Sequence, residues 1–513
     1  MISVARLKFI LVLIAVFMAS VFMASHAEAV TLRVARNQIP PSLGNPYTSA
    51  GQPGAAIWSA LFDALTVVEP NGDLSPGLAL RWDLVSPTRW RFYLRPNVTF
   101  HDGQPFDANT VVANIQALQT EAGKRLYMAT EVAGISKVTV IEPLVVEIET
   151  AKPDAILPKR LAIIMIVEPK AWAKDEGAFA LKPIGTGPWT LVDWGRTTGR
   201  SVFTANKKSW RAPKQLDRLE IVILPEATTR LSALLTGEVD VAEAFTPDDL
   251  GELEGQPFRS VMQEGTQVMA IAFRTTGDKK TPLHDPRVRQ ALNYAVNRAE
   301  IVDTILHGKS KVASQGCTAL VFGCNATLTP YPYDPAKAKV LLTEAGYGSG
   351  FKLKLEVLTG FGLSDQLIYQ RMAEQLGQVG VKVTIETPSY ATWLRKYLSN
   401  QWDDTDAFSL FWDNSSYRDV IRAVKYYSCD KPNPFFCDQT IMPEIYASDV
   451  IMDVGARRKA LEAIMAKLKD LAPSLWMVEI PYHYAITNDI DKFATRTLGV
   501  SYEDITFSAG KRK

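Results

Sequence analysis

The sequence predicts a mixed α/β protein built from more than one lobe. Its 513 residues exceed what a single hydrophobic core usually organises, so two or three domains are expected. Segments with strand-like alternation and segments with helical periodicity follow one another along the chain. Residues 352–386 combine a strand, a helix and a second strand, a unit that favours parallel pairing through a right-handed crossover.

In the N-terminal part, each expected element has its own local signal. Residues 31–37 alternate like a strand, and residues 54–65 carry large apolar side chains at helical spacing. Residues 88–100 alternate as a half-buried strand does. Asp107 is suited to cap the helix that follows it. Residues 137–150 form a hairpin around a Glu-Pro turn.

Farther along, two helices have clear starts. Asp285 and Asp334 are each followed by proline, which places an acidic N-cap before a proline at the first helical position. The second of these helices is expected to stop at Gly346. The apolar segments predicted as strands are 219–225, 268–275 and 352–359.

Residues 1–29 have the three parts of a secretory signal peptide. Arg6 and Lys8 precede the apolar run Phe9–Met23, and Ala27-Glu28-Ala29 forms a cleavage site after Ala29. A retained membrane anchor is the alternative, but the apolar run is shorter than the roughly 18 residues that a span needs. We therefore expect a soluble, exported mature protein.

Four cysteines remain in the exported chain, and an oxidising compartment favours disulfides between them. Three pairings are possible. Closeness in sequence favours Cys317 with Cys324 and Cys429 with Cys437. A zinc site is the alternative, yet neither pair has the spacing of common zinc clusters.

The composition and motifs argue against several classes of protein. The chain is 47% hydrophobic and 22% charged with a net charge of +1, which predicts no nucleic-acid-binding surface and no general attraction to anionic membranes. Zinc-protease, nucleotide-loop and serine-hydrolase motifs are missing from it. We expect no cofactor, no metal site and no catalytic residues. Because catalytic triads assemble in space, a secreted hydrolase is kept as the remote alternative.

The segment 411–419, FWDNSSYRD, is the strongest candidate for a binding site. It combines aromatic, acidic, basic, amide and hydroxyl side chains, and it follows the strand-like residues 406–412. Polar groups crowded at the end of a strand usually belong to a site.

Several segments together resemble one family, the peptide/nickel-type solute-binding proteins of ATP-driven bacterial importers, solute-binding protein family 5. They occur in the family's order and span most of the mature chain. The segments that carry the resemblance are 73–112, 183–194, 228–242, 282–308 and 333–347.

The resemblance implies a two-lobed periplasmic binding protein fold with two hinge crossings and an extra domain grown on the first lobe. The hinge strands would be residues 268–276 and 481–489. The implied parts are the first lobe at 30–66, 183–270 and 484–513, the extra domain at 67–182, and the second lobe at 271–483.

The resemblance also implies where the ligand binds. Trp393 and Trp412 keep the spacing that two ligand-facing tryptophans have in the family's peptide binders. Those binders usually place an aspartate, which pairs with the peptide amino terminus, where this chain has Ser415. Some place an arginine where it has Asn400. The candidate ligand-binding residues are Trp393, Trp412, Asp413, Asn414, Tyr417, Arg418 and Asp419.

A charge-assisted contact to a peptide terminus is worth about 1.5–3 kcal/mol. Losing both contacts, at Ser415 and Asn400, would weaken peptide binding unless Asp413, Asp419 or Arg418 takes their place. The resemblance still implies a periplasmic component of an ABC transporter that captures peptides by hinge closure. Chelated nickel, glutathione, an opine or an oligosaccharide is the alternative ligand. The implied partners are two membrane-spanning permease subunits and two ATP-binding subunits, and the free protein is expected to be a monomer.

Overall fold

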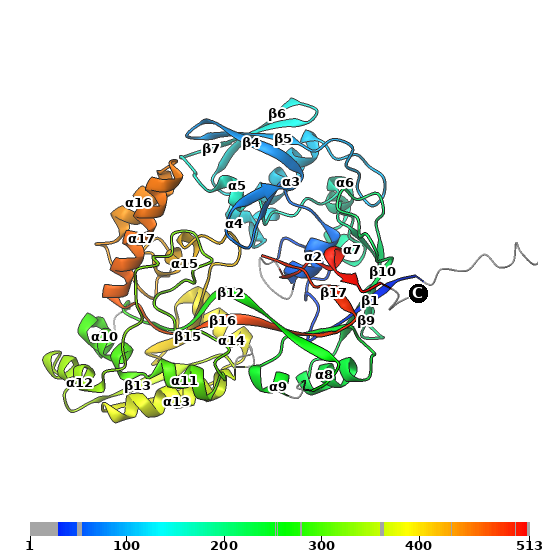
Figure 1. Ribbon diagram of the computed structural model, residues 1–513. Helices are drawn as coiled ribbons and strands as arrows, with labels where there is room; N and C mark the ends of the chain where they lie inside the picture. Colours follow the sequence, from blue (N-terminus) through cyan, green and yellow to red (C-terminus); the bar gives the residue numbers. More distant parts are fainter. Residues whose placement is uncertain are drawn as a thin grey trace, which may run out of the picture.

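The computed structural model describes residues 29–509 apart from 49–53, 252, 254, 278–279, 360–363, 432 and 498. The predicted signal peptide, residues 1–28, lies outside the described part, so cleavage after Ala29 stays a prediction. Two lobes flank a pair of long strands, β12 (Phe258–Phe273) and β16 (Ser474–Thr487), which run side by side across the molecule (Figure 1). The predicted α/β fold with two lobes is confirmed.

Among the described residues, ten strands form one sheet that passes through both lobes, in the order β14-β13-β15-β12-β16-β11-β1-β10-β9-β8. The end of the sheet with β8 belongs to the first lobe, and the end with β14 belongs to the second lobe. The strands of the first lobe are β1 (Thr31–Arg36), β8 (Trp189–Asp193), β9 (Arg200–Ala205), β10 (Arg218–Ile223) and β11 (Val241–Glu243). Those of the second are β13 (Phe351–Glu356), β14 (Val381–Glu386) and β15 (Ala407–Asp413).

Helices cover both halves of this sheet. In the first lobe they are α2 (Gly54–Leu61), α8 (Ala227–Leu235) and α9 (Pro247–Gly251). In the second lobe they are α10 (Pro286–Ala295), α11 (Arg298–Thr304), α12 (Pro335–Glu344), α13 (Asp365–Gln378), α14 (Tyr390–Ser399), α15 (Ile421–Val424), α16 (Met442–Val450) and α17 (Val454–Leu471). Within the described ranges, no helix is both long and apolar enough to cross a membrane.

An additional domain lies above the first lobe in Figure 1 and is built on a separate antiparallel sheet of order β4-β5-β7-β6. Its strands are β4 (Ala79–Ser86), β5 (Arg89–Leu94), β6 (Ile135–Glu142) and β7 (Val145–Thr150). Its helices are α3 (Ala108–Gln119), α4 (Ala129–Val132), α5 (Leu157–Arg160), α6 (Pro169–Lys174) and α7 (Glu176–Leu181). Two short strands, β2 (Thr66–Val68) and β3 (Leu74–Pro76), connect it to the first lobe.

The local signals in the sequence explain where these elements begin. The carboxylate of Asp107 accepts from the backbone N–H of Thr110 at 2.9 Å, which satisfies a free donor in the first turn of α3. Asp285 and Asp334 cap α10 and α12 in the same way, each before a proline. β13 and β14 pair in parallel through α13, as predicted.

The long strands change register where they pass between the lobes. β12 and β16 are antiparallel, and the regular pairing is interrupted between Gln263 and Gln267. Gly265 lies in this interruption, and a Cβ atom there would stand 1.8 Å from the carbonyl oxygen of Ile480. Only glycine therefore permits this close approach of the two backbones. Most of each predicted hinge segment lies in a strand, since β12 contains residues 268–273 and β16 contains residues 481–487; their role as hinges stays a prediction.

The cysteines pair as closeness in sequence predicted. Cys317 is bonded to Cys324 and Cys429 to Cys437, with Cα atoms 5.9 Å and 4.6 Å apart. Each bridge closes a short loop of the second lobe. The second loop lies directly after α15, close to the end of β15.

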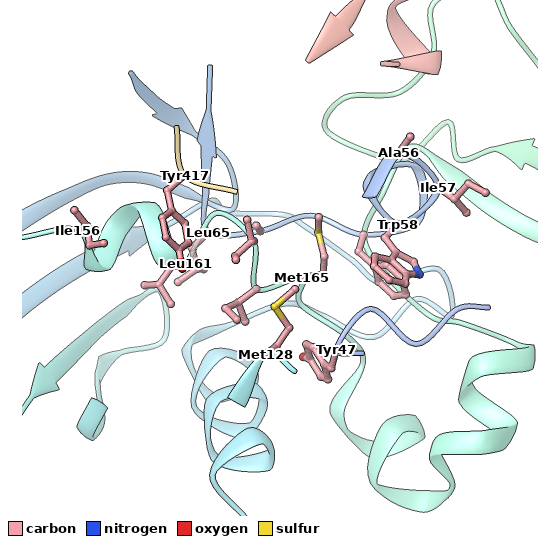
Figure 2. Packing of buried hydrophobic residues seen from close by; sticks show 14 of the residues in the cluster. Tyr47, Ala56, Ile57, Trp58, Leu65, Met128, Ile156, Leu161, Met165 and Tyr417 are labelled. Atoms are coloured by element: carbon pink, nitrogen blue, oxygen red, sulfur yellow. The ribbon is translucent and has the colours of Figure 1, made fainter. Parts of the chain in front are cut away.

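The lobes are in contact across the space between them. Figure 2 shows Tyr417 of the second lobe beside Leu65 and Leu161, and all three belong to one continuous hydrophobic cluster. Met128 and Met165 extend this packing into the additional domain. The structure is thus that of a closed two-lobed protein.

Candidate ligand-binding site between the lobes

The candidate segment is the loop that leaves β15 and enters α15. β15 is almost entirely buried, because it pairs with β12 on one side and β13 on the other. At its end, the carboxylate of Asp413 accepts from the backbone N–H of Ser415 at 2.8 Å, which turns the chain out of the sheet. The turn directs residues 414–420 toward the first lobe and the additional domain.

Asp413 and Arg422 form an ion pair at the start of this loop. One terminal nitrogen of the Arg422 guanidinium donates to the carboxylate of Asp413 at 3.1 Å and to the backbone carbonyl oxygen of Asp413 at 2.8 Å. The same nitrogen lies 2.6 Å from the Tyr426 hydroxyl. The other terminal nitrogen donates to the hydroxyl of Tyr127 at 2.9 Å. Tyr127 belongs to the additional domain, so this network joins the two sides of the molecule.

Three tyrosines, Tyr426 of this network and two others, lie around the ion pair. Tyr397, Tyr426 and Tyr482 each keep solvent-accessible surface, and yet burial raises the pKa of all three. These side chains are thus enclosed by protein on most sides and accessible to solvent on the rest, and the space that they border is called the cleft below. At neutral pH these hydroxyls are uncharged and can both donate and accept hydrogen bonds.

Asp413 remains ionised in this cleft. Burial alone would raise the pKa of its carboxyl, but the charge of Arg422 and hydrogen bonds from Ser415 and Gln267 outweigh burial, so the pKa lies below its usual value. The side chain of Asp413 is 22% exposed and that of Arg422 is 9% exposed. One negative and one positive group thus lie side by side, each with some exposed surface.

Asp419 has a different environment. Its side chain is fully buried, and both carboxylate oxygens accept from the guanidinium of Arg457, at 2.6 and 3.1 Å. Lys159 of the additional domain lies 3.8 Å from the same carboxylate. This carboxylate is already surrounded by protein cations, whereas that of Asp413 has one cationic partner and keeps part of its surface exposed.

Tyr417 and Arg418 contact the opposite side of the molecule. The Tyr417 hydroxyl lies 2.7 and 2.6 Å from the two carboxylate oxygens of the buried Glu131 in α4. Arg418 has a φ of 48°, donates to the carbonyl oxygen of Pro70 and donates to the Thr497 hydroxyl at 3.0 Å. Both residues join the lobes in this closed form.

The remaining candidates are buried among side chains of the second lobe. Trp412 is stacked on Tyr427 with ring centroids 4.4 Å apart. Trp393 is stacked on Tyr397 at 5.2 Å and is 6% exposed. Asn414 donates to the carbonyl oxygen of Gly316 at 3.1 Å and is completely buried. The structure thus brings Asp413 into the cleft and packs these three residues behind it.

A cavity lies beside the loop, on its first-lobe side. It encloses about 650 Å³, including the space at its mouth, between the base of the additional domain and the C-terminal residues 496–503. Asp63, Arg211 and Glu503 form a buried ion-pair cluster in its wall. Ser416 closes it from the second lobe, and its buried hydroxyl has no hydrogen-bond partner among the described residues.

The sequence alone did not indicate Arg422, Tyr426, Tyr482 or Tyr127 as site residues. Arg422 and Tyr426 follow the candidate segment at helical spacing, and extending that segment into α15 would have found them. Tyr127 and Tyr482 lie far away in the sequence. Tyr127 reaches Arg422 across the space between the lobes, whereas Tyr482 lies on β16, which pairs with β12 beside the end of β15.

Comparison with known proteins agrees with this architecture. Residues 73–433 match the model of the bacterial extracellular solute-binding proteins, family 5. The chain belongs to this family. Family 5 proteins are binding proteins, and the resemblance seen in the sequence is confirmed.

Among curated relatives, this family 5 chain is 30% identical to heme-binding protein A of Haemophilus influenzae over 63% of its length and 64% of the relative's. It is 29% identical to the nickel-binding periplasmic protein of Escherichia coli, over 56% of both. The matches thus span less than two thirds of these two relatives. The di/tripeptide-binding protein 1 of Pseudomonas aeruginosa is 26% identical over 89% of this chain and 91% of that protein.

Solved structures show the same fold. The ABC transporter-associated periplasmic binding protein DppA from Helicobacter pylori, in complex with the peptide STSA, superposes with a TM-score of 0.78 at 20% identity, covering 93% of this chain and 98% of that one. The binding protein AgaA from A. tumefacien R10, in complex with agropinic acid, superposes with a TM-score of 0.77 at 24% identity. This match covers 94% of this chain and 99% of that one.

Proposed function

We propose that this protein is the solute-binding component of an ABC importer and that it captures a short peptide or peptide-like solute by closing its two lobes. The proposal rests chiefly on the Asp413–Arg422 pair in the tyrosine-lined cleft. An adjacent carboxylate and guanidinium match the ammonium and carboxylate groups that amino-acid-derived solutes carry.

The absence of an aspartate at position 415 is compatible with peptide capture. Ser415 donates its backbone N–H to Asp413, so the acidic group is displaced along the loop rather than missing. Asn400 lies away from this network and donates to the carbonyl oxygen of Pro434 at 2.8 Å. Asp413 thus takes the role of the amine-binding aspartate in this proposal.

Closure of the lobes gives the mechanism of capture. Arg422 reaches Tyr127, Tyr417 reaches Glu131 and Arg418 reaches residue 70, each across the space between the lobes. These contacts form only when the lobes meet, so a solute that favours the closed form is trapped. Opening at the membrane subunits would release it.

The remaining parts of the proposal follow from family membership. We expect export through a signal peptide cleaved after Ala29, a monomeric free protein in the periplasm, and an importer with two permease and two ATP-binding subunits. We assign residues 30–66, 183–270 and 484–513 to the first lobe, 67–182 to the additional domain and 271–483 to the second lobe. In this role the protein binds its solute without converting it.

The proposal is tested with residues 30–513, unfolded and refolded to remove bound solute. Thermal melting is followed with di- to pentapeptides, glutathione, nickel with chelators, opines and oligosaccharides. A ligand at 1,000 times its Kd adds about 4 kcal/mol to the free energy of unfolding. Peptides should raise the midpoint. If only another solute does so, the peptide assignment is wrong, and turnover of any solute would contradict a purely binding role.

A further inference from the structure

One lysine near the cleft has no acidic partner. Lys431 lies in the loop closed by the Cys429–Cys437 disulfide, and its Nζ donates to the Tyr397 hydroxyl at 2.9 Å. Nζ also lies 4.1 Å from the centre of the Tyr397 ring and 4.8 Å from that of Phe435. In the part of the chain that the structure describes, no carboxylate lies within ion-pairing distance of it. Burial lowers the pKa of Lys431 to about 8.

Tyr397 connects this lysine to the candidate site. The Tyr397 hydroxyl accepts from Lys431, and the groups that influence its pKa after burial are Tyr127 and Arg422, so Tyr397 is near the Arg422 network as well as Lys431. Asp413 balances the charge of Arg422. The charge of Lys431 is left over, and this side of the cleft carries an excess positive charge.

The position of Lys431 is fixed rather than free. Its loop is closed by the disulfide, and its ammonium group lies over the rings of Tyr397 and Phe435, which are themselves in contact. A contact with two aromatic faces stabilises a cation, whereas burying an ammonium group without a counter-ion costs free energy. A bound anion would remove that cost, which favours a recognition role over a packing role.

We infer that Lys431 and the Tyr397 hydroxyl bind a carboxylate group of the captured solute. The inference rests on the proposed function and narrows it: the solute carries an acidic group at the Lys431 side in addition to the groups that meet Asp413 and Arg422. For a short peptide this group is the C-terminal carboxylate or an acidic side chain.

The test compares trialanine with trialanine amide, which lacks the terminal carboxylate, by titration calorimetry on the refolded mature chain. In the wild type the acid should bind at least about tenfold more tightly than the amide, as a charge-assisted hydrogen bond provides. Lys431→Met should abolish this preference, and Lys431→Arg should retain part of it. Lys459→Met, at an exposed lysine of α17, is the matched control and should behave as the wild type.

A purely structural lysine gives a different result. Lys431→Met would then lower the melting temperature but leave the preference for acid over amide unchanged, and this outcome overturns the inference. Equal binding of acid and amide by the wild type also overturns it.

If neither peptide binds the wild type and no other peptide of the panel does, the peptide proposal fails, and succinate tests Lys431 separately. Succinate should then stabilise the wild type, Lys431→Arg and Lys459→Met more than Lys431→Met. An equal response of all four proteins would refute the carboxylate site.

Discussion

The hydroxyl of Tyr417 offers the sharpest test of the closed arrangement. Tyr417→Phe keeps the ring against Leu65 and Leu161 and removes only the oxygen that contacts both carboxylate oxygens of Glu131. Glu131 keeps its ion pair with Arg160 at 3.1 Å. The expected loss is therefore near the lower end of the about 1.5–3 kcal/mol that hydrogen bonds to charged groups contribute.

Because this contact joins the lobes, its loss should destabilise the closed form and leave the open form unaffected. A loss of about 1.5 kcal/mol corresponds to roughly tenfold weaker solute binding. Titration calorimetry with a solute found in the melting panel measures the affinity, and small-angle scattering measures the closed population without solute. The melting temperature of the solute-free, open protein should change little.

Tyr446→Phe is the matched control. Its hydroxyl donates to Asp430 at 2.6 Å, also a tyrosine–carboxylate contact, but both residues belong to the second lobe and are exposed. This variant should bind solute as the wild type does. The reasoning is refuted if Tyr417→Phe binds with unchanged affinity, or if both variants weaken binding equally.

Three further predictions concern charged groups. Asp413→Asn should weaken binding of a zwitterionic peptide at least about tenfold, measured by calorimetry, whereas an unchanged Kd would exclude it as the amine-binding group. Arg457→Met removes the guanidinium that pairs with the buried Asp419 and leaves only Lys159 near its carboxylate. Denaturant titration should show a free energy of unfolding lower by about 3–5 kcal/mol. A decrease of less than about 1 kcal/mol would contradict the importance of the buried pair. Burial lowers the pKa of Lys431 from 10.5 to about 8 in the folded protein. Between these two pH values the unfolded chain therefore binds more protons than the folded protein does. The free energy of unfolding should consequently increase as pH rises from 8 to 10.5. The free energy of unfolding of Lys431→Met, measured over the same pH range, should lack this increase. If the wild type and the variant depend on pH in the same way, the lowered pKa of Lys431 is contradicted.

Local structure was predictable where the determining interactions are close in sequence. Asp107, Asp285 and Asp334 cap helices through backbone groups two or three residues away, so the pattern of residue types suffices. The disulfides also join near neighbours. The two-lobed arrangement came from resemblance, because pairing of β12 with β16 joins residues that no local pattern connects.

The candidate segment was predictable as a site, but the role of each side chain was not. Asp413 and Asp419 look equivalent in the sequence. Their difference arises from Arg422 on one side and from Arg457 and Lys159 on the other, and two of these three cations are distant in the chain. Which residue faces the cleft is decided by tertiary contacts.

The position of β16 in the shared sheet has a consequence for how the protein matures. This strand lies near the C-terminus, yet it stands between β12 and β11 and so joins the halves of the sheet. Neither half is complete until the last part of the chain has been synthesised. A chain that ends before β16 exposes two unpaired strand edges, a form prone to aggregation. The same dependence delays completion of the sheet until almost the whole chain is present, so the order of the strands sets when the two lobes can be joined.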